Sequence, residues 1–260
     1  MTKLLAGKDV AGFIQERHAQ TVRGLLVAPK LAIVRQGATP ATDAYLRVKK
    51  QYGADIGVMV DTYTEAPADL MARIAALNAD PSVTGIIVQL PFADQPDLAE
   101  QALAAVAPAK DVDGLSPHSP FEAATPKAIL WLLAAYNVDL SGRRIAVVGQ
   151  GRLVGAPLAD RLDASGHDVA RLDEHTPNLA AALHDAGAII TATGQPGLIT
   201  SAMVADGAIV VDAASPRSDL ARDLFDRADL IITPNPGGVG PMTVASLFDN
   251  LLIAAQTRHP

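Results

Sequence analysis

The chain has 260 residues, 49% hydrophobic and 19% charged, so it can bury a substantial core and is not intrinsically disordered. Its net charge of −7 argues against a nucleic-acid partner, because such proteins normally present a basic face. The chain has no cysteine, and its six histidines show no metal-ligand spacing, so we expect neither disulfides nor a metal site.

Nothing in the sequence is typical of secretion or of a membrane span. The amino-terminal stretch MTKLLAGKDVAGF is interrupted by Lys8 and Asp9, which is not the pattern of a secretion signal. The longest apolar run, residues 128–136, is much shorter than a membrane-spanning helix. We therefore expect a soluble cytoplasmic protein without a membrane partner.

In the first part of the chain, short β-branched segments alternate with helical patterns, which is typical of a parallel α/β sheet. Helices are expected over residues 41–52 and 67–78, the second with Thr64 as its N-cap. The expected strands are residues 31–35, 57–63 and 85–90.

A second α/β series begins after the segment 115–120, which contains proline and serine, and we place a domain boundary near residue 118. A helix is expected over residues 153–165, after the first strand of this series, and a last helix over 243–256, with no strand after it. The expected strands are residues 144–148, 168–172, 188–191, 208–212 and 230–233.

A glycine-rich loop, VVGQGRLVG from residue 147, joins the first strand of the second series to its helix. In this context Gly149 would form a tight turn, and Gly151 would let the backbone approach a pyrophosphate. Gly155 would allow close packing of the helix on the strand, with the phosphates at the positive end of that helix. The loop therefore predicts a dinucleotide site, although its spacing is G-x-G-x-x-x-G.

Two acidic residues, Asp173 and Glu174, follow the next strand. An acid at this position typically accepts hydrogen bonds from the adenosine ribose hydroxyls. Two solvated charges at a strand end are the alternative interpretation.

Tyr45 and Lys49 are four residues apart on an expected helix and share one face. Such a pair can transfer protons, because an ammonium stabilises a phenolate and burial lowers the pKa of a lysine. Short-chain dehydrogenases use the same spacing, but their glycine loop precedes the pair, whereas here it follows. This order argues against a short-chain dehydrogenase.

Further polar groups lie at expected strand ends, where open α/β sheets bind their ligands. Gln89 ends an apolar strand, and the segment 110–114 (KDVDG) places Asp111 and Asp113 in a turn. Capping a turn requires only one aspartate.

Taken together, these segments resemble the bifunctional methylenetetrahydrofolate dehydrogenase/cyclohydrolase family almost from end to end. The last segment is the most specific, because eight consecutive residues from Pro236 match the family pattern. The matching segments are 45–49 (YLRVK), 85–91 (GIIVQLP), 110–114 (KDVDG), 147–149 with 154–157 (VVG and VGAP), 192–196 (ATGQP) and 233–243 (TPNPGGVGPMT).

The resemblance implies reversible oxidation of 5,10-methylenetetrahydrofolate to the methenyl form by NADP or NAD, followed by hydrolysis to 10-formyltetrahydrofolate. It implies two α/β domains with a cleft between them. Residues 1–118 with 244–260 would form a folate-binding catalytic domain, and residues 119–243 a Rossmann-type parallel sheet. The C-terminal helix would return to the first domain, and the protein would be a homodimer.

The resemblance also assigns roles to residues. Lys49 would be essential for cyclohydrolysis, Gln89 would hydrogen-bond it and help set its charge, and Tyr45 would stack on the folate. Asp113 would anchor the pterin, with Asp111 as the open alternative. Further substrate contacts would be Thr42, Pro236, Gly237 and Gly238. The cofactor contacts would be Thr125, Gly149, Gln150, Gly151, Leu153, Asp173, Glu174, Ala192, Gly240 and Thr243.

The sequence departs from the family around the expected cofactor site. Gln150-Gly151 stands where the family commonly has Arg-Ser, and Glu174 stands in the place of a serine. These changes remove a cation and add a charge that repels a 2′-phosphate, which favours NAD. Arg152 and Arg171 are close enough in sequence to restore NADP binding.

Loops after Gly114 and after Ala214 are also shorter than in the family. A member that retains only the cyclohydrolase activity is therefore an alternative. A non-catalytic folate- or nucleotide-binding protein is a second one.

Overall fold

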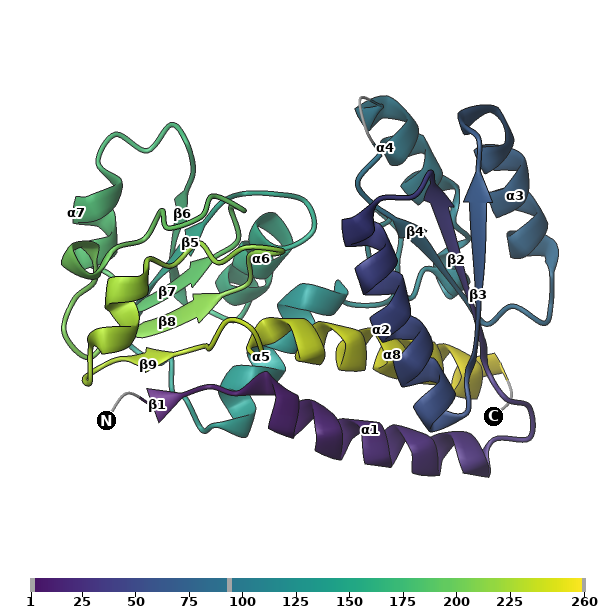
Figure 1. Ribbon diagram of the computed structural model, residues 1–260, viewed down its shortest axis with the longest axis horizontal. Coiled ribbons are helices and arrows are strands. Elements are labelled where there is room, and N and C mark those ends of the chain that lie inside the picture. The colour runs from purple at the N-terminus through teal and green to yellow at the C-terminus, as the bar shows by residue number, and fades with distance from the viewer. Residues whose placement is uncertain (1–2, 93–94, 259–260) are drawn as a thin grey trace. The chain divides into compact units, whose positions relative to one another are not determined.

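The computed structural model describes residues 3–92 and 95–258, which form two compact units. Unit 1 takes the described residues up to Ala11 together with Thr125–Thr243. Unit 2 takes Gly12–Ala124 and the described residues from Val244 onward. Both units are α/β, and each contains its own parallel sheet (Figure 1).

This division differs from the predicted boundaries in two places. The first residues belong to unit 1, because strand β1 (Lys3–Leu4) pairs in parallel with β9 (Ile231–Ile232). A strand of two residues is too short to show a period in the sequence. The later boundary lies at the start of helix α5 (Ala124–Ala135) rather than near residue 118.

Unit 2 contains a three-stranded parallel sheet in the order β3-β2-β4. The central strand is continuously apolar and buried from Leu31 to Val34, as expected of a strand covered on both faces. The strands are β2 (Lys30–Gln36), β3 (Met59–Glu65) and β4 (Gly85–Gln89). The other elements of this unit are α2 (Pro40–Ile56), α3 (Pro67–Ala79), α4 (Pro96–Ala105) and the short η1 (Pro108–Lys110). It also contains the parts of α1 (Gly7–Gly24) from Gly12 and of α8 (Val239–Arg258) from Val244.

The part of α8 from Val244 onward packs in unit 2, so the C-terminal helix returns to this unit as the sequence predicted. The ring of Phe248 stacks on Tyr52 of α2, with ring centroids 4.8 Å apart. Asn250 Nδ2 donates to the carbonyls of Val112 and Glu122, at 2.9 Å each. Apolar packing and the two hydrogen bonds of the Asn250 amide nitrogen thus fix the helix beside the 111–124 segment.

Unit 1 contains a six-stranded parallel sheet in the order β1-β9-β8-β7-β5-β6, which is the predicted Rossmann-type architecture. The chain passes from β5 to β6 on one side of β5 and continues with β7 on the other. The remaining elements are β5 (Arg144–Val148), α6 (Gly155–Ala164), β6 (Asp168–Leu172), α7 (Leu179–His184), β7 (Ala188–Thr191), η2 (Ser201–Met203), β8 (Ile209–Asp212) and η3 (Arg222–Asp226).

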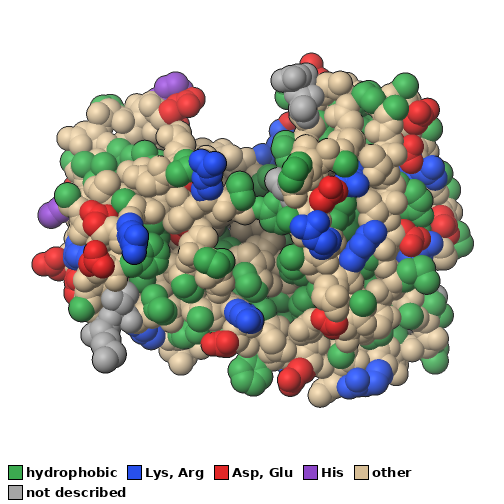
Figure 2. Space-filling view, viewed as in Figure 1, with side chains coloured by type: hydrophobic (Ala, Val, Ile, Leu, Met, Phe, Trp, Pro, Cys, Tyr) green, Lys and Arg blue, Asp and Glu red, His purple; other side chains and the backbone are tan. Residues whose placement is uncertain are grey.

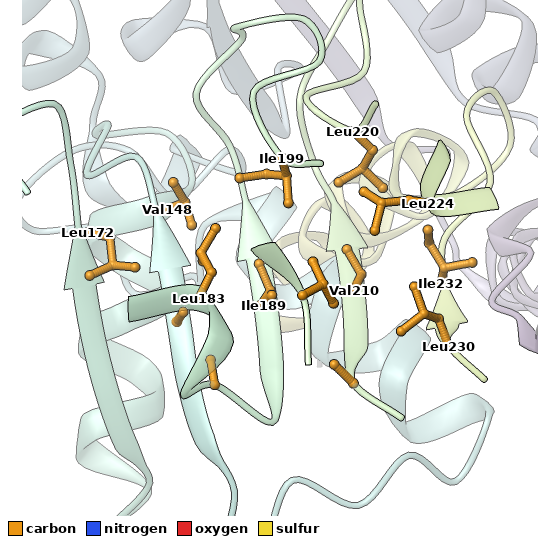
Figure 3. Packing of buried hydrophobic residues seen from close by; sticks show 14 residues of the cluster. Val148, Leu172, Leu183, Ile189, Ile199, Val210, Leu220, Leu224, Leu230 and Ile232 are labelled. Atoms are coloured by element: carbon orange, nitrogen blue, oxygen red, sulfur yellow. The ribbon is translucent and has the colours of Figure 1, made fainter. Parts of the chain in front are cut away.

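One face of this sheet carries an apolar cluster, shown in Figure 3. Val148, Ile189 and Val210 project from neighbouring strands toward Leu183 of α7 and Leu224 of η3. Because side chains alternate along a strand, every second residue reaches this face and packs against the covering segments.

One predicted helix start is wrong. Thr64 lies within β3 and does not cap α3, whose N-cap is Ala66 without a side-chain hydrogen bond. Pro67 at the first helical position explains the start instead, because proline has no N–H to satisfy there.

No helix within residues 3–92 and 95–258 is long and apolar enough to span a membrane. On the face seen in Figure 2, acidic and basic side chains are interspersed.

Candidate active site

Lys49 of α2 and Gln89, the last residue of β4, form the centre of a polar group in unit 2. Lys49 Nζ donates to Gln89 Oε1 at 2.8 Å. Gln89 Nε2 donates to the carbonyl of Leu90 at 2.9 Å, so the amide is fixed with its oxygen toward the lysine. The lysine is thus held by a neutral acceptor.

Asp113 is the charged group that acts on this lysine. Burial lowers the pKa of Lys49, and the negative charge of Asp113 partly opposes that shift. Burial likewise raises the pKa of Asp113, with an opposing effect from Lys49 and a further increase from Asp111. Both side chains remain partly accessible at the surface, and the shifts arise from the protein packed around their charged ends. The site therefore shifts Lys49 toward the neutral amine, on a side chain that solvent can partly reach.

Asp111 has a different role. It is buried, and its Oδ2 accepts a hydrogen bond from the backbone N–H of Ser116 at 2.8 Å. It caps the turn that carries Asp113. Of the two aspartates, Asp113 is therefore the one whose charge acts on Lys49.

The first turn of α2 is fixed by a reciprocal capping box. The Thr42 N–H donates to Thr39 Oγ1 at 3.2 Å, and the Thr39 N–H donates to Thr42 Oγ1 at 3.0 Å. Arg35, at the end of β2, forms an ion pair with Asp43 and donates to Thr64 Oγ1 at 2.9 Å. These contacts anchor the helix that carries Tyr45 and Lys49. Sequence reasoning missed the Arg35–Asp43 pair, since neither residue belongs to a motif.

Thr42 itself is buried within the capping box, whereas Tyr45 is 39% exposed one turn before Lys49. The aromatic ring therefore has a surface that a ligand can approach. Thr42, at the third position of α2, helps to fix the first turn of the helix that carries Tyr45 and Lys49.

In unit 1 the glycine loop has the predicted turn. Gly149 has φ +88°, and a Cβ there would lie 2.9 Å from the carbonyl oxygen of Ala192. A Cβ on Gly155 would lie 1.7 Å from the carbonyl oxygen of Gly149, so only glycine allows this packing of α6. Beside Gly151 no described atom outside its chain neighbours lies within 4 Å of such a Cβ. The loop therefore leaves open space at Gly151, before the start of α6.

Near the expected adenosine position, the side chains of Gln150 and Arg171 are both engaged in contacts within unit 1. Gln150 Nε2 donates to the carbonyl of Val147 at 2.9 Å. Arg171 on β6 pairs with two carboxylates of α6, Asp160 at 2.8 Å and Asp163. The exposed Asp173 accepts the His175 N–H at 2.9 Å in the turn after β6.

Thr125 and Thr243 are brought together in unit 1, where their hydroxyl oxygens are 3.4 Å apart. Thr243 and Gly240 lie in the first turns of α8, and the segment 236–238 directly precedes that helix. Gly237 has φ +103°, and a Cβ on Gly238 would lie 2.7 Å from the carbonyl oxygen of Pro234. Of the remaining predicted residues, Leu153 and Glu174 are exposed, and Ala192 follows β7.

Two family models match the chain. Residues 5–113 match the catalytic domain of tetrahydrofolate dehydrogenase/cyclohydrolase, and residues 123–259 match its NAD(P)-binding domain. The chain belongs to the tetrahydrofolate dehydrogenase/cyclohydrolase family.

Relatives of this family align over nearly the full chain. The bifunctional protein FolD of Bordetella avium is 37% identical, over 98% of this chain and 97% of that protein. The FolD crystal structure from Campylobacter jejuni has a TM-score of 0.92 at 32% identity and covers 99% of this chain and all of that one. The Trypanosoma brucei enzyme, complexed with NADP and an inhibitor, has a TM-score of 0.92 at 27% identity, with 99% and 98% coverage.

For this tetrahydrofolate dehydrogenase/cyclohydrolase, the two groups of predicted residues fall in different family domains. Lys49, Gln89 and Asp113 lie within the catalytic match, and the glycine loop lies within the NAD(P)-binding match. The chain is thus an enzyme of folate chemistry with a nicotinamide cofactor domain. In the described part of the chain, no group of three His, Cys, Asp or Glu side chains could hold a metal ion.

Proposed function

We propose that this chain carries both activities of its family. It oxidises 5,10-methylenetetrahydrofolate reversibly with NAD(P), and it hydrolyses the methenyl product to 10-formyltetrahydrofolate. The observation that carries the proposal is the Lys49–Gln89 hydrogen bond beside Asp113, which provides a partly exposed lysine with a lowered pKa.

In the hydrolytic step, water adds to an amidinium cation and loses a proton. A neutral Lys49 amine can accept that proton, whereas an ammonium cannot. Burial lowers the pKa of Lys49 and so makes the neutral form more accessible, and the Gln89 oxygen orients Nζ without adding a negative charge. The positive charge of the substrate favours neutral Lys49 further, because like charges repel.

Substrate binding is assigned to the residues that the family resemblance names. Asp113 anchors the pterin, because a carboxylate accepts hydrogen bonds from ring N–H groups. Tyr45 stacks on the folate with its exposed ring. Thr42, Pro236, Gly237 and Gly238 are the further substrate contacts.

In the oxidative step, a bound nicotinamide cofactor would supply the hydride acceptor for the methylene carbon, whose flanking folate nitrogens supply electrons. The protein therefore needs to orient the reactants rather than to supply a strong base. The open space at Gly151, before α6, fits a pyrophosphate at a helix N-terminus. The other cofactor contacts are Thr125, Gly149, Gln150, Leu153, Asp173, Glu174, Ala192, Gly240 and Thr243.

The enzyme prefers NAD to NADP in this proposal. Asp173 and Glu174 present exposed carboxylates after β6, and Arg171 is already paired with two acids of α6. Gln150 turns its amide N–H toward the Val147 carbonyl. A 2′-phosphate would meet acidic groups here, whereas ribose hydroxyls would find acceptors.

One absorbance assay tests the function. Methenyltetrahydrofolate formation is followed separately with NAD and NADP, and the loss of added methenyltetrahydrofolate is followed without cofactor. Both activities, with a larger kcat/KM for NAD, are expected. Hydrolysis alone would establish the cyclohydrolase-only alternative, which the altered glycine loop favours. Binding without either conversion would show a passive folate-binding protein.

The family resemblance also implies a homodimer in the cytoplasm. Light scattering of the purified protein should give twice the 27.0 kDa chain mass, and a monomer mass would reject the dimer. Cell fractionation tests the location.

A further inference from the structure

Asp219 is a fully buried carboxylate in the loop after β8 of unit 1. Its Oδ2 accepts two short hydrogen bonds, from Thr191 Oγ1 at 2.6 Å and from the backbone N–H of Thr193 at 2.7 Å. Thr191 ends β7, and Thr193 belongs to the segment that follows it. One carboxylate oxygen therefore fixes the exit of the chain from β7.

This segment packs directly on the glycine loop. A Cβ placed on Gly149 would lie 2.9 Å from the Ala192 carbonyl oxygen and 3.0 Å from Thr193 Cγ2. The contact joins the carboxyl ends of β5 and β7. Because the chain order changes direction between these two strands, this is the switch point at which open α/β sheets bind ligands.

A second buried acid continues the network on the other side of Asp219. Asp212, at the end of β8, accepts from Ser218 Oγ at 2.6 Å and from Asn235 Nδ2 at 3.2 Å. Ser218 immediately precedes Asp219, so Asp212 fixes the loop that delivers the carboxylate. Although the loop after β8 is shortened, these hydrogen bonds hold it in the position from which Asp219 contacts the end of β7.

Burying the carboxylate of Asp219 is energetically unfavourable, and filling space in the core does not require an acid at this position. Its second oxygen, Oδ1, is buried and has no hydrogen-bond partner among the described residues. A buried polar atom without a partner is unfavourable, and a buried charged group is more so. A residue that merely filled this space would not need the acid.

We propose that Asp219 is a positioning residue of the dinucleotide site. It holds Thr193 in place, and through the 192–193 segment it fixes the turn at Gly149. The inference rests on the proposed nicotinamide cofactor function of unit 1, and it adds a residue outside the glycine loop to that site.

Binding of NADH, measured by its fluorescence, tests the role apart from turnover. Asp219→Leu removes the acceptor, and we expect the Kd for NADH and the KM for NAD to rise roughly tenfold, with a smaller change in kcat. Asp219→Asn keeps one oxygen for both donors and should restore binding to within about threefold. Hydrolysis of added methenyltetrahydrofolate should stay near the wild-type rate in both variants.

Asp229→Asn is the matched control in the same unit. Asp229 accepts from Arg227 and from the Gly207 N–H, at the amino ends of the strands. Its substitution should lower Tm without changing the Kd for NADH. If Asp219→Leu does not fold, Thr191→Val removes one donor with little change of shape and should raise the Kd about threefold.

Several outcomes would overturn the role of Asp219. One is wild-type affinity for NADH in folded Asp219→Leu or in Thr191→Val, and another is a failure of Asp219→Asn to restore binding. A loss of hydrolysis in Asp219→Leu as large as its loss of NADH affinity would also do so, as would an equal loss of NADH affinity in Asp229→Asn. A wild-type protein that binds no NADH would instead overturn the cofactor function on which the inference rests.

Discussion

At the scale of single residues, the proposed hydrolytic chemistry depends on two opposing influences on Lys49. Burial lowers its pKa, and the charge of Asp113 raises it. Gln89 contributes an oxygen without a charge. Removing the charge of Asp113 and adding a charge at Gln89 should therefore shift the pH dependence of methenyl hydrolysis in opposite directions.

Asp113→Asn removes the charge that favours the ammonium, so the pKa of Lys49 should fall further. More of the lysine is then neutral at a given pH, and the acidic limb of kcat for methenyl hydrolysis should move to lower pH. The profile is measured at saturating substrate, because loss of the proposed pterin anchor should raise KM. A limb that stays in place or moves to higher pH would contradict this coupling.

Gln89→Glu has the opposite sign. A carboxylate in place of the amide, whose oxygen lies 2.8 Å from Nζ, favours the charged lysine. The acidic limb should move to higher pH, and the rate near pH 7 should fall roughly tenfold. The same pH profile provides the measurement, and an unchanged limb would show that Lys49 is not the titrating group.

At the scale of elements, the two ends of the glycine loop have separable roles. Gly155→Ala places a Cβ against the Gly149 carbonyl and should destabilise the protein by about 1–3 kcal/mol, because α6 must shift. Gly151→Ala meets no described neighbour, so its Tm should stay near wild type while NADH binds more weakly. Thermal unfolding and NADH titration of both variants check the pair. A loss of stability in Gly151→Ala would argue that the open space is structural.

The sequence identified those elements whose patterns are local. Strands β5, β6 and β7 have the predicted bounds. In β5 and β7 the apolar runs mark covered strands, whereas β6 is a partly exposed edge strand that is expected from its position after the predicted helix. Strand β1 was missed because its two residues form a strand only through their pairing with β9, which the local sequence does not indicate. The cap of α3 was misplaced because Pro67 starts that helix without a side-chain cap.

The candidate site shows the same limit. Lys49, Gln89 and Asp113 could be named from motifs that the resemblance supplied. The pairing of Arg171 with Asp160 and Asp163 could not, because it depends on how α6 packs on β6. The role of Asp219 could not be predicted either, because its hydrogen-bond partners are 26 and 28 residues away in the sequence.

At the scale of the whole molecule, the chemistry is divided between two compact units. The lysine group lies in unit 2, and the glycine loop with Asp219 lies in unit 1. Each unit has its own sheet and its own buried core. Substitutions at the lysine group should therefore leave NADH binding intact, and those at Asp219 should leave hydrolysis intact.

The most direct test of the account is the rate at which Lys49→Met hydrolyses methenyltetrahydrofolate, followed by absorbance. Lys50→Met is the matched control, because Lys50 is the next residue of α2 and is exposed. The account predicts that Lys49→Met loses at least about a hundredfold in kcat, with wild-type Tm and NADH affinity, while Lys50→Met stays near wild type. Hydrolysis by Lys49→Met at the wild-type rate would contradict it.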